Sequence, residues 1–212
     1  MPARNPDLHG NVPDTAAAAL LLIDLINDFE YPGGDALFAQ ALPLADRLRT
    51  LKRRAKAAGI PVVYVNDNYG RWRSDFRMLV EHCLRDGVRG RPVVERLLPE
   101  PDDYFVLKPK HSGFYSTTLD VLLAYLRAET LLLTGVAGDV CVLFTAHDAF
   151  MRDFRLVVPA DCVASIDPAS NDYALARMRD VLAADLTPST ALDLVALARR
   201  TAPVQTENVR TP

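Results

Sequence analysis

The stretch TLLLTGVAGDVCVLFTAHDAF, residues 130–150, decides the fold class. Its first part, 130–137, is a short apolar run of the kind that forms a buried strand, and residues 139–153 have the pattern of a helix. The two parts meet in a turn that contains Gly135 and Gly138. A strand that leads directly into a helix is the building unit of a parallel sheet. We therefore expect a parallel α/β arrangement around this segment.

The same alternation continues on both sides of it. The continuous apolar run AAALLLID at 17–24 is typical of a parallel strand that is buried on both faces. The further predicted elements are, in chain order, a helix over 43–58 ended by Gly59, a strand at 61–66, a helix around 75–85, a strand at 104–108, a helix over 117–127 capped by Thr117 or Thr118, a strand at 155–161, a helix over 168–183, a short strand near 185–187 and a helix near 191–199. We predict a three-layer, Rossmann-like αβα fold with a mostly parallel sheet of about six strands and helices on both faces.

The length and composition favour one domain. A chain of 212 residues with 50% hydrophobic and 24% charged residues can bury a single large core. We place that domain at 15–200, after an N-terminal extension at 1–14 and before a loose C-terminal tail at 201–212.

Charge and hydropathy narrow the class of partner. The net charge of −3 gives no reason to expect binding to nucleic acid or to a membrane. The first residues lack the apolar core of a targeting signal, and the longest apolar run, 16–23, is too short to span a bilayer. Three widely spaced cysteines do not form a disulfide framework and favour a reducing cytoplasm. We expect a cytoplasmic protein that acts on a small molecule.

Three residues with reactive side chains come at or just after predicted strands. Asp24 ends the first strand, Lys108 ends the third, and Cys141 follows the fourth. Ligands of open α/β sheets bind beyond the carboxyl ends of the strands. We therefore expect these three side chains to lie at the same rim of the sheet.

A carboxylate, an ammonium and a thiol at one rim suit nucleophilic catalysis. Cys141 falls in the first turn of a helix, where free N–H groups favour a thiolate and could hold an oxyanion. Asp24 could move protons and Lys108 could stabilise the thiolate. Each residue alone also has a structural explanation: a turn cap for Asp24, a surface lysine for Lys108 and a small buried side chain for Cys141.

Three stretches resemble the isochorismatase-like cysteine hydrolase family. They are LLIDLINDF (21–29) with the later Gly33–Gly34, LKPKHSGFYSTTLDVLL (107–123), and LLLTGVAGDVCVLFTAHDAF (131–150) continuing into VVPADCVAS. The resemblance covers most of the chain, roughly residues 17–190. It implies that Asp24 is the general acid and base, Lys108 its charge partner and Cys141 the nucleophile. It also implies a cis peptide between Val136 and Ala137, an oxyanion hole formed by the N–H groups of Ala137 and Cys141, and a homo-oligomer, a dimer or a tetramer.

The chain departs from its relatives in two places. Nicotinamidases of this family carry a metal bound by an aspartate and histidines after the second strand, but the region NDNYGRWRSDF (66–76) has no histidine. We expect no metal and no cofactor, which argues against nicotinamide as the substrate. Gly138 stands where many relatives have threonine, so we expect a looser loop that lacks one hydroxyl.

Several further residues could line the site. The four histidines are His9, His82, His111 and His147, of which only His111 is close enough to Lys108 in sequence to reach the pocket. The candidate substrate-binding aromatics, each of which could instead pack in the core, are Phe29, Tyr69, Trp72, Phe114 and Tyr115. Arg71 and Arg73 flank Trp72 and could bind an anion, although they could equally be surface residues. Cys83 and Cys162 are expected to be structural.

Three functions remain open. The leading hypothesis is hydrolysis of a non-peptide C–N bond, of amide, carbamoyl or ureido type, through a thioester on Cys141. The second is isochorismatase-type cleavage of a vinyl ether, in which Asp24 protonates the substrate and no cysteine is needed. The third is a ligand-binding subunit without catalysis, because a fold alone does not prove activity.

Overall fold

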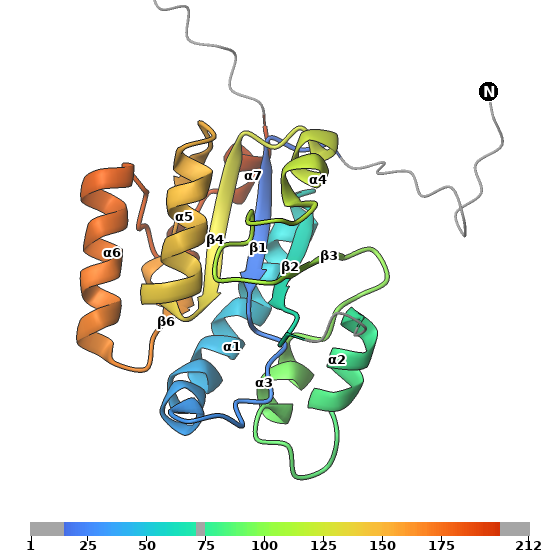
Figure 1. The fold of residues 1–212 in the computed structure, drawn as a ribbon. Helices are drawn as coiled ribbons and strands as arrows, with labels where there is room; N and C mark the ends of the chain where they lie inside the picture. The colour runs from blue at the N-terminus through green and yellow to red at the C-terminus, as the bar shows by residue number, and fades with distance from the viewer. Residues whose placement is uncertain (1–14, 71–74, 200–212) are drawn as a thin grey trace, which may run out of the picture.

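A computed structural model of the chain describes residues 15–70 and 75–199. Its centre is a parallel sheet with the strand order β3-β2-β1-β4-β5, in which β6 pairs with β4 (Figure 1). The strands are β1 (Ala18–Ile23), β2 (Val62–Asp67), β3 (Tyr104–Lys108), β4 (Thr130–Val136), β5 (Arg155–Val157) and β6 (Val163–Ala164). The predicted six-stranded parallel sheet is confirmed.

Helices cover both faces of the sheet. One core contains Leu20 and Leu22 of β1 and packs against α1 (Gly34–Ala57), α2 (Phe76–Cys83), α3 (Arg91–Arg96) and α7 (Leu194–Ala198). The other contains Leu21 and Ile23 and packs against α4 (Leu119–Leu126), α5 (Leu143–Phe150) and α6 (Pro168–Leu182). Because β1 has a helical layer on each side, all of its residues are buried, which explains its unbroken apolar sequence. The three-layer prediction is confirmed.

The first helix is longer than its sequence pattern indicated. The prediction began it at residue 43, but α1 begins at Gly34 and carries Pro43 inside it. Leu37 and Ala41 are buried on the same helix and extend the apolar stripe towards the N-terminus. Pro43 therefore lies in the interior of α1, a position that is uncommon for proline.

The segments after β4 are more divided than predicted. The helix expected at 139–153 is a π-helical turn over Gly138–Val142 followed by α5. The strand expected at 155–161 ends at Val157, and a 3₁₀ turn over Ala160–Cys162 leads into β6. The strand expected near 185–187 is a single bridge between Val157 and Asp185.

Three further helical features differ from the prediction. The short helix α3 was not predicted, and a 3₁₀ turn over Ser189–Ala191 precedes α7. Helix α4 begins at Leu119, two residues later than expected. Thr118 at its N-cap makes no capping bond with its side chain, whereas Thr117 Oγ1 accepts a 3.2 Å hydrogen bond from the Leu119 N–H.

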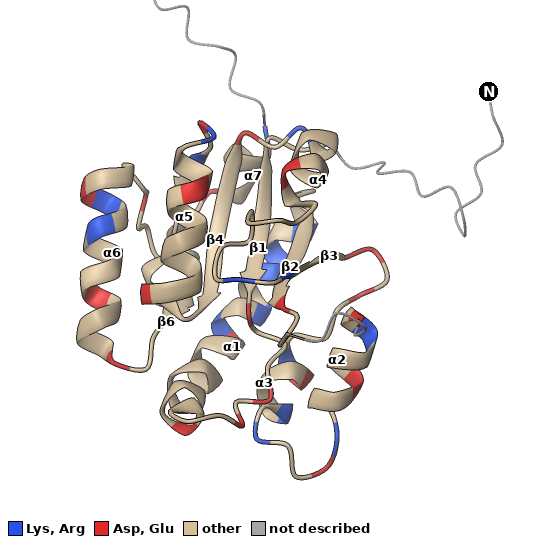
Figure 2. Ribbon diagram, in the orientation of Figure 1, with Lys and Arg blue, Asp and Glu red and all other residues tan. Residues whose placement is uncertain are grey.

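Charged residues of both signs are spread over the helices (Figure 2). No helix in the described part of the chain is long and apolar enough to cross a membrane.

Candidate active site

The structure brings Asp24, Lys108 and Cys141 together at the carboxyl ends of the strands. Lys108 Nζ lies 2.8 Å from Asp24 Oδ2 and 3.5 Å from Cys141 Sγ. Asp24 follows β1, Lys108 is the last residue of β3, and Cys141 lies in the π-helical turn after β4. Strand β2 separates β3 from β1, so the lysine side chain reaches across the end of β2 to meet the carboxylate.

Backbone contacts hold Asp24 in place. Its φ of 51° lies in the left-handed region, which is uncommon for a residue other than glycine and is frequent at functional sites. Its N–H donates a 2.9 Å hydrogen bond to the Val65 carbonyl, and its Oδ1 accepts a 2.8 Å hydrogen bond from the Asp67 N–H. The end of β2 therefore fixes both the backbone and the carboxylate of Asp24.

Lys108 is fully buried beside two carboxylates and a thiol. Besides Asp24 and Cys141, it faces Asp67, whose Oδ2 lies 3.6 Å from Nζ. Burial works to lower the pKa of Lys108, but attraction to Asp24 and to Cys141 outweighs it, so that the pKa is raised. The lysine remains an ammonium and supplies the positive charge of the site.

Burial raises the pKa values of both remaining groups. Removal from water raises the pKa of the Asp24 carboxyl, although Lys108 opposes this shift. Burial and the nearby Asp24 carboxylate raise the pKa of the Cys141 thiol to about 12, again against the effect of Lys108. The expected thiolate is therefore not the resting form, because loss of hydration outweighs the helix N-terminus and the lysine. Cys141 needs a base when it reacts.

The turn around Cys141 has the local geometry that the resemblance implied. The peptide bond between Val136 and Ala137 is cis. The N–H groups of Val140 and Val142 both donate to the Ala137 carbonyl, at 3.2 and 3.1 Å. The oxyanion hole assigned to the N–H groups of Ala137 and Cys141 remains a prediction.

The two glycines of the turn are required for different reasons. Gly135 has a φ of 115°, and a Cβ atom there would lie 2.1 Å from the Ile23 carbonyl oxygen. Gly138 has no room for a side chain either, because a Cβ atom would lie 2.5 Å from Val163 Cγ1. The turn is thus closely packed, and the expected looser loop is wrong.

A neighbouring hydroxyl stands beside Gly138. Ser165 is buried, and its Oγ accepts a 3.0 Å hydrogen bond from the Asp139 N–H. The same oxygen lies 3.0 Å from Asn171 Oδ1, to which it donates. A side-chain hydroxyl from the loop after β6 therefore binds the backbone of the turn that carries Cys141, where the sequence had suggested that a hydroxyl was missing.

The predicted substrate-binding residues do not all reach the site. Phe29 and Phe114 are buried in the two hydrophobic cores, so for these two the alternative of core packing is correct. Tyr115 is exposed, with 58% of its surface accessible. Arg71, Trp72 and Arg73 lie outside the described residues.

Tyr69 lines a cavity beside the site. The cavity has a volume of about 320 Å³. Its lining residues are Asp28, Asp67, Asn68, Tyr69, Asp75, Met78, Leu79, His82, Arg85 and Leu107. It reaches the three clustered residues at Asp67, the neighbour of Lys108. The space for a bound molecule therefore extends from the ends of β2 and β3 towards α2.

Asp67 and Tyr31 were not among the site residues predicted from the sequence. Asp67 ends β2 as Asp24 follows β1, so the rule that selected Asp24 also selects Asp67. Tyr31 lies in the loop between β1 and α1, and its pKa is raised by burial and by the negative charges of Asp24 and Asp28. Nothing in its local sequence distinguishes Tyr31 from an ordinary loop residue.

The histidines and the other cysteines have separate environments. His111 Nδ1 lies 3.9 Å from Cys141 Sγ, His82 pairs with Asp28 at 3.0 Å, and His147 is exposed on α5. Cys83 and Cys162 are buried. Within residues 15–70 and 75–199, no three His, Cys, Asp or Glu side chains are grouped so that they could hold a metal ion.

Comparison with known proteins gives the family. Residues 18–189 match the isochorismatase domain. The isochorismatase family protein YaaI of Bacillus subtilis is 39% identical over 172 residues, which are 81% of this chain and 94% of that protein. The ureidoacrylate amidohydrolase RutB of Methylobacterium radiotolerans is 30% identical over 182 residues, 74% of this chain and 70% of that protein.

A solved structure supports the same assignment. The N-carbamoylsarcosine amidase from Thermoplasma acidophilum is 31% identical, with a TM-score of 0.63, and the match covers 83% of this chain and 98% of that one. Domain match, sequence relatives and fold agree over the same part of the chain. This chain belongs to the isochorismatase family and is a hydrolase of that family.

Proposed function

We propose that the protein is a small-molecule amidohydrolase in which Cys141 is the nucleophile. The observation that carries this proposal is the position of Lys108 Nζ, which lies within reach of both Asp24 and the Cys141 sulfur. A buried ammonium between a carboxylate and a thiol stabilises the negative charge as it moves from one to the other.

The reaction begins from a neutral thiol. Asp24 takes the Cys141 proton as Sγ attacks the carbonyl carbon of the substrate. The tetrahedral oxyanion is held by the N–H groups of Ala137 and Cys141. Asp24 then delivers the proton to the departing nitrogen, the C–N bond breaks, and the acyl group remains on Cys141 as a thioester. Water hydrolyses the thioester and restores the thiol.

The two amidohydrolase relatives and the cavity support a proposal for the substrate class. Ureidoacrylate and N-carbamoylsarcosine, which name those relatives, both carry a terminal carbamoyl group on nitrogen. We propose a ureido or carbamoyl compound whose reactive carbonyl lies at Cys141. The rest of the molecule would occupy the cavity that begins at Asp67 and includes Tyr69.

The test is ammonia release from a panel of ureidoacrylate, N-carbamoylsarcosine and simple amides. The wild-type protein should hydrolyse at least one of them, and Cys141→Ala should lose nearly all turnover. Cys83→Ala is the matched control, because that thiol is buried in the core and should not affect the chemistry. Full activity in Cys141→Ala would exclude nucleophilic catalysis by this residue.

The raised pKa of Asp24 supports a second candidate, vinyl-ether hydrolysis. A carboxyl group whose pKa is raised by burial is better able to donate a proton to a substrate. In this reaction Cys141→Ala would still cleave isochorismate, while Asp24→Asn would not. A binding protein without catalysis would differ from both, because Asp24→Asn would bind its ligand with almost unchanged affinity.

A further inference from the structure

We propose that His111 is a second catalytic residue, which accepts the proton of the water that hydrolyses the Cys141 thioester. This inference rests on the proposed function, because it needs a thioester on Cys141. It divides the proton transfers between two groups, with Asp24 acting as the thioester forms and His111 acting as it is hydrolysed.

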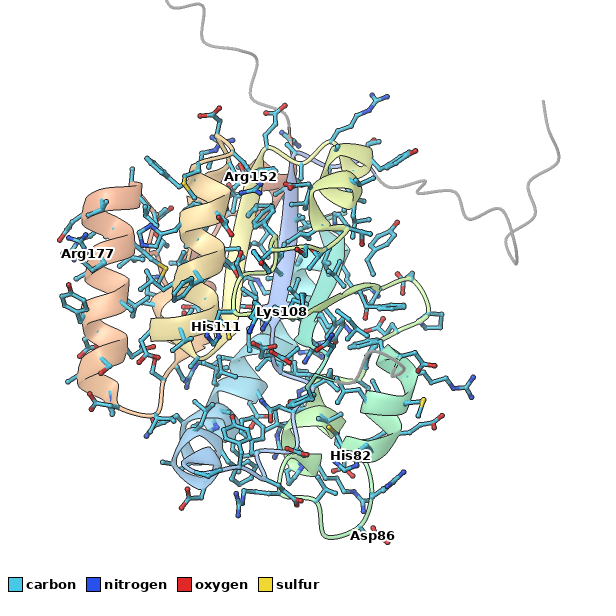
Figure 3. All side chains as sticks on the ribbon, in the orientation of Figure 1. His82, Asp86, Lys108, His111, Arg152 and Arg177 are labelled. Atoms are coloured by element: carbon cyan, nitrogen blue, oxygen red, sulfur yellow. The ribbon has the colours of Figure 1, made fainter. Side chains whose placement is uncertain are left out.

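His111 lies against the reacting sulfur. Its Nδ1 is 3.9 Å from Cys141 Sγ, within contact distance for a sulfur atom. Lys108 and Asp24, in contrast, are buried, while the imidazole is exposed to solvent. Figure 3 shows Lys108 and His111 close to each other at the ends of the central strands. The imidazole therefore stands where water can approach the sulfur.

The loop that carries His111 is bound to α5, which directly follows the turn that carries Cys141. Ser112 Oγ donates a hydrogen bond to Asp148 Oδ2 on α5. The Gly113 N–H donates to Thr145 Oγ1 at 3.0 Å, and that hydroxyl donates to the Cys141 carbonyl at 2.7 Å. These contacts directly follow His111 in the chain and set its position relative to Cys141.

Ring packing holds the imidazole itself. The ring of His111 lies 5.4 Å from that of Phe144, at an interplanar angle of 47°. Phe144 is on α5, three residues after Cys141, so the nucleophile and the ring that supports His111 belong to the same continuous segment. The exposed imidazole thus has a defined orientation, as a proton acceptor requires.

The chemistry of the second half-reaction favours such a group. Once the leaving nitrogen has taken its proton, Asp24 is a buried carboxylate 2.8 Å from Lys108, whereas His111 is exposed to the solvent that supplies the water. Imidazole exchanges protons readily near neutral pH. In the step proposed here, the water oxygen bonds to the thioester carbon while His111 takes one water proton. The C–S bond then breaks, the acid leaves, and His111 returns the proton to the sulfur.

The experiment uses p-nitrophenyl acetate as an acylating probe, so that the natural substrate need not be known. Wild-type protein, His111→Gln and His111→Ala are mixed with the probe. Release of nitrophenolate reports acylation, and mass spectrometry follows the acetyl group on Cys141. His147→Gln is the matched control, because its imidazole is also exposed and lies on α5, six residues after Cys141.

We expect both His111 variants to acylate at about the wild-type rate and to lose the acetyl group about 100-fold more slowly, a loss within the range typical of a general base. Added imidazole should restore deacylation in His111→Ala and leave His147→Gln unchanged. A purely structural role would not give this rescue.

Other outcomes would overturn the inference. Deacylation at the wild-type rate in His111→Gln excludes the role, and so does an equal slowing of acylation and deacylation. If the wild type and both His111 variants fold but none of them gains an acetyl group on Cys141, the nucleophile of the proposed function fails and the inference fails with it. The two failures are therefore distinguishable.

Discussion

A Cβ atom on Gly138 would lie 2.3 Å from Oδ1 of Asn171, so the turn that carries Cys141 packs directly against α6. Asn171 in turn receives a hydrogen bond from Ser165, which binds the Asp139 N–H. Ser165 and Asn171, which follow Cys141 by 24 or more positions in the chain, therefore help to hold the turn that carries it.

This contact predicts that Gly138→Ala destabilises the protein. The added methyl group must displace Asn171 and Val163, and overpacking of this kind costs about 1–3 kcal/mol. Activity should fall as well, because the displaced backbone carries Cys141. Urea unfolding and the amidase assay measure the two effects. In a double-mutant cycle, Gly138→Ala should cost less in an Asn171→Ala background. Strict additivity of the two changes would contradict the proposed contact.

The pKa of Cys141 predicts a specific pattern of alkylation by iodoacetamide. A rise from 9.0 to about 12 lowers the thiolate fraction at neutral pH about 1000-fold. The alkylation rate should therefore increase with pH without a plateau below about pH 10. Cys83 and Cys162, which are buried, should not react in the folded protein. Peptide mass spectrometry distinguishes the three sites.

Two substitutions should move this rate in opposite directions. Asp24→Asn removes a negative charge that raises the pKa of Cys141, so alkylation at a fixed pH should become faster. Lys108→Met removes the positive charge that lowers it, so alkylation should become slower. Circular dichroism verifies that both variants fold. A change in the same direction for both would contradict the electrostatic explanation.

The raised pKa of Asp24 predicts the pH dependence of catalysis. A base must be ionised, so kcat/KM of an amidase falls as the pH drops through the pKa of Asp24, which burial places above its ordinary 3.8. Because Lys108 lowers that pKa, Lys108→Met should shift the acidic limb to higher pH while reducing the maximal rate. A vinyl-ether hydrolase that uses Asp24 as an acid would show the opposite sign, losing activity as the pH rises.

A second buried lysine predicts a change in stability alone. Lys52 Nζ bonds to Asp103 Oδ2 at 2.6 Å and to the Leu98 carbonyl at 2.9 Å, and both charged side chains are almost inaccessible. Lys52→Met should lower the free energy of unfolding by about 3 kcal/mol, the lower part of the range for a broken buried pair, because Lys56 still contacts Asp103.

Lys56→Met provides the comparison in urea unfolding. Lys56 is more exposed and also pairs with the exposed carboxylates of Glu100 and Asp102, so its loss should cost less. Equal costs for the two lysines would show that burial does not determine the contribution of Lys52.

The layers of the fold and the cluster of three residues were predictable from the sequence. Both follow from local patterns: apolar runs mark the strands of a buried sheet, and polar residues at their carboxyl ends fall at one rim. The resemblance also implied the cis peptide between Val136 and Ala137, which the structure contains. The strand alternation predicted only that Lys108 and Asp24 share a rim, and their 2.8 Å contact also depends on the strand order β3-β2-β1.

The remaining features depend on long-range packing. The crowding of Gly138 comes from Val163 and Asn171, and no local pattern indicates a neighbour 25 or 33 residues away. A phenylalanine can either line a pocket or pack in a core, and the sequence does not distinguish the two. Only the positions of the two hydrophobic cores show that Phe29 and Phe114 pack in them. Cys141 is a neutral thiol at rest because it is buried, and a sequence pattern typical of a helix start does not indicate burial.

The contact between Lys108 and Asp24 forms only when the strands pair in the correct register. Lys108 pairs with Asp67 in β2, and Val65 of β2 pairs with Ile23, the residue before Asp24. A slip of one residue between β2 and β3 would turn Lys108 to the opposite face of the sheet and leave Asp24 without its cation. During refolding, activity should therefore return only in molecules in which β1, β2 and β3 have aligned correctly. We expect activity to recover later than the helical signal.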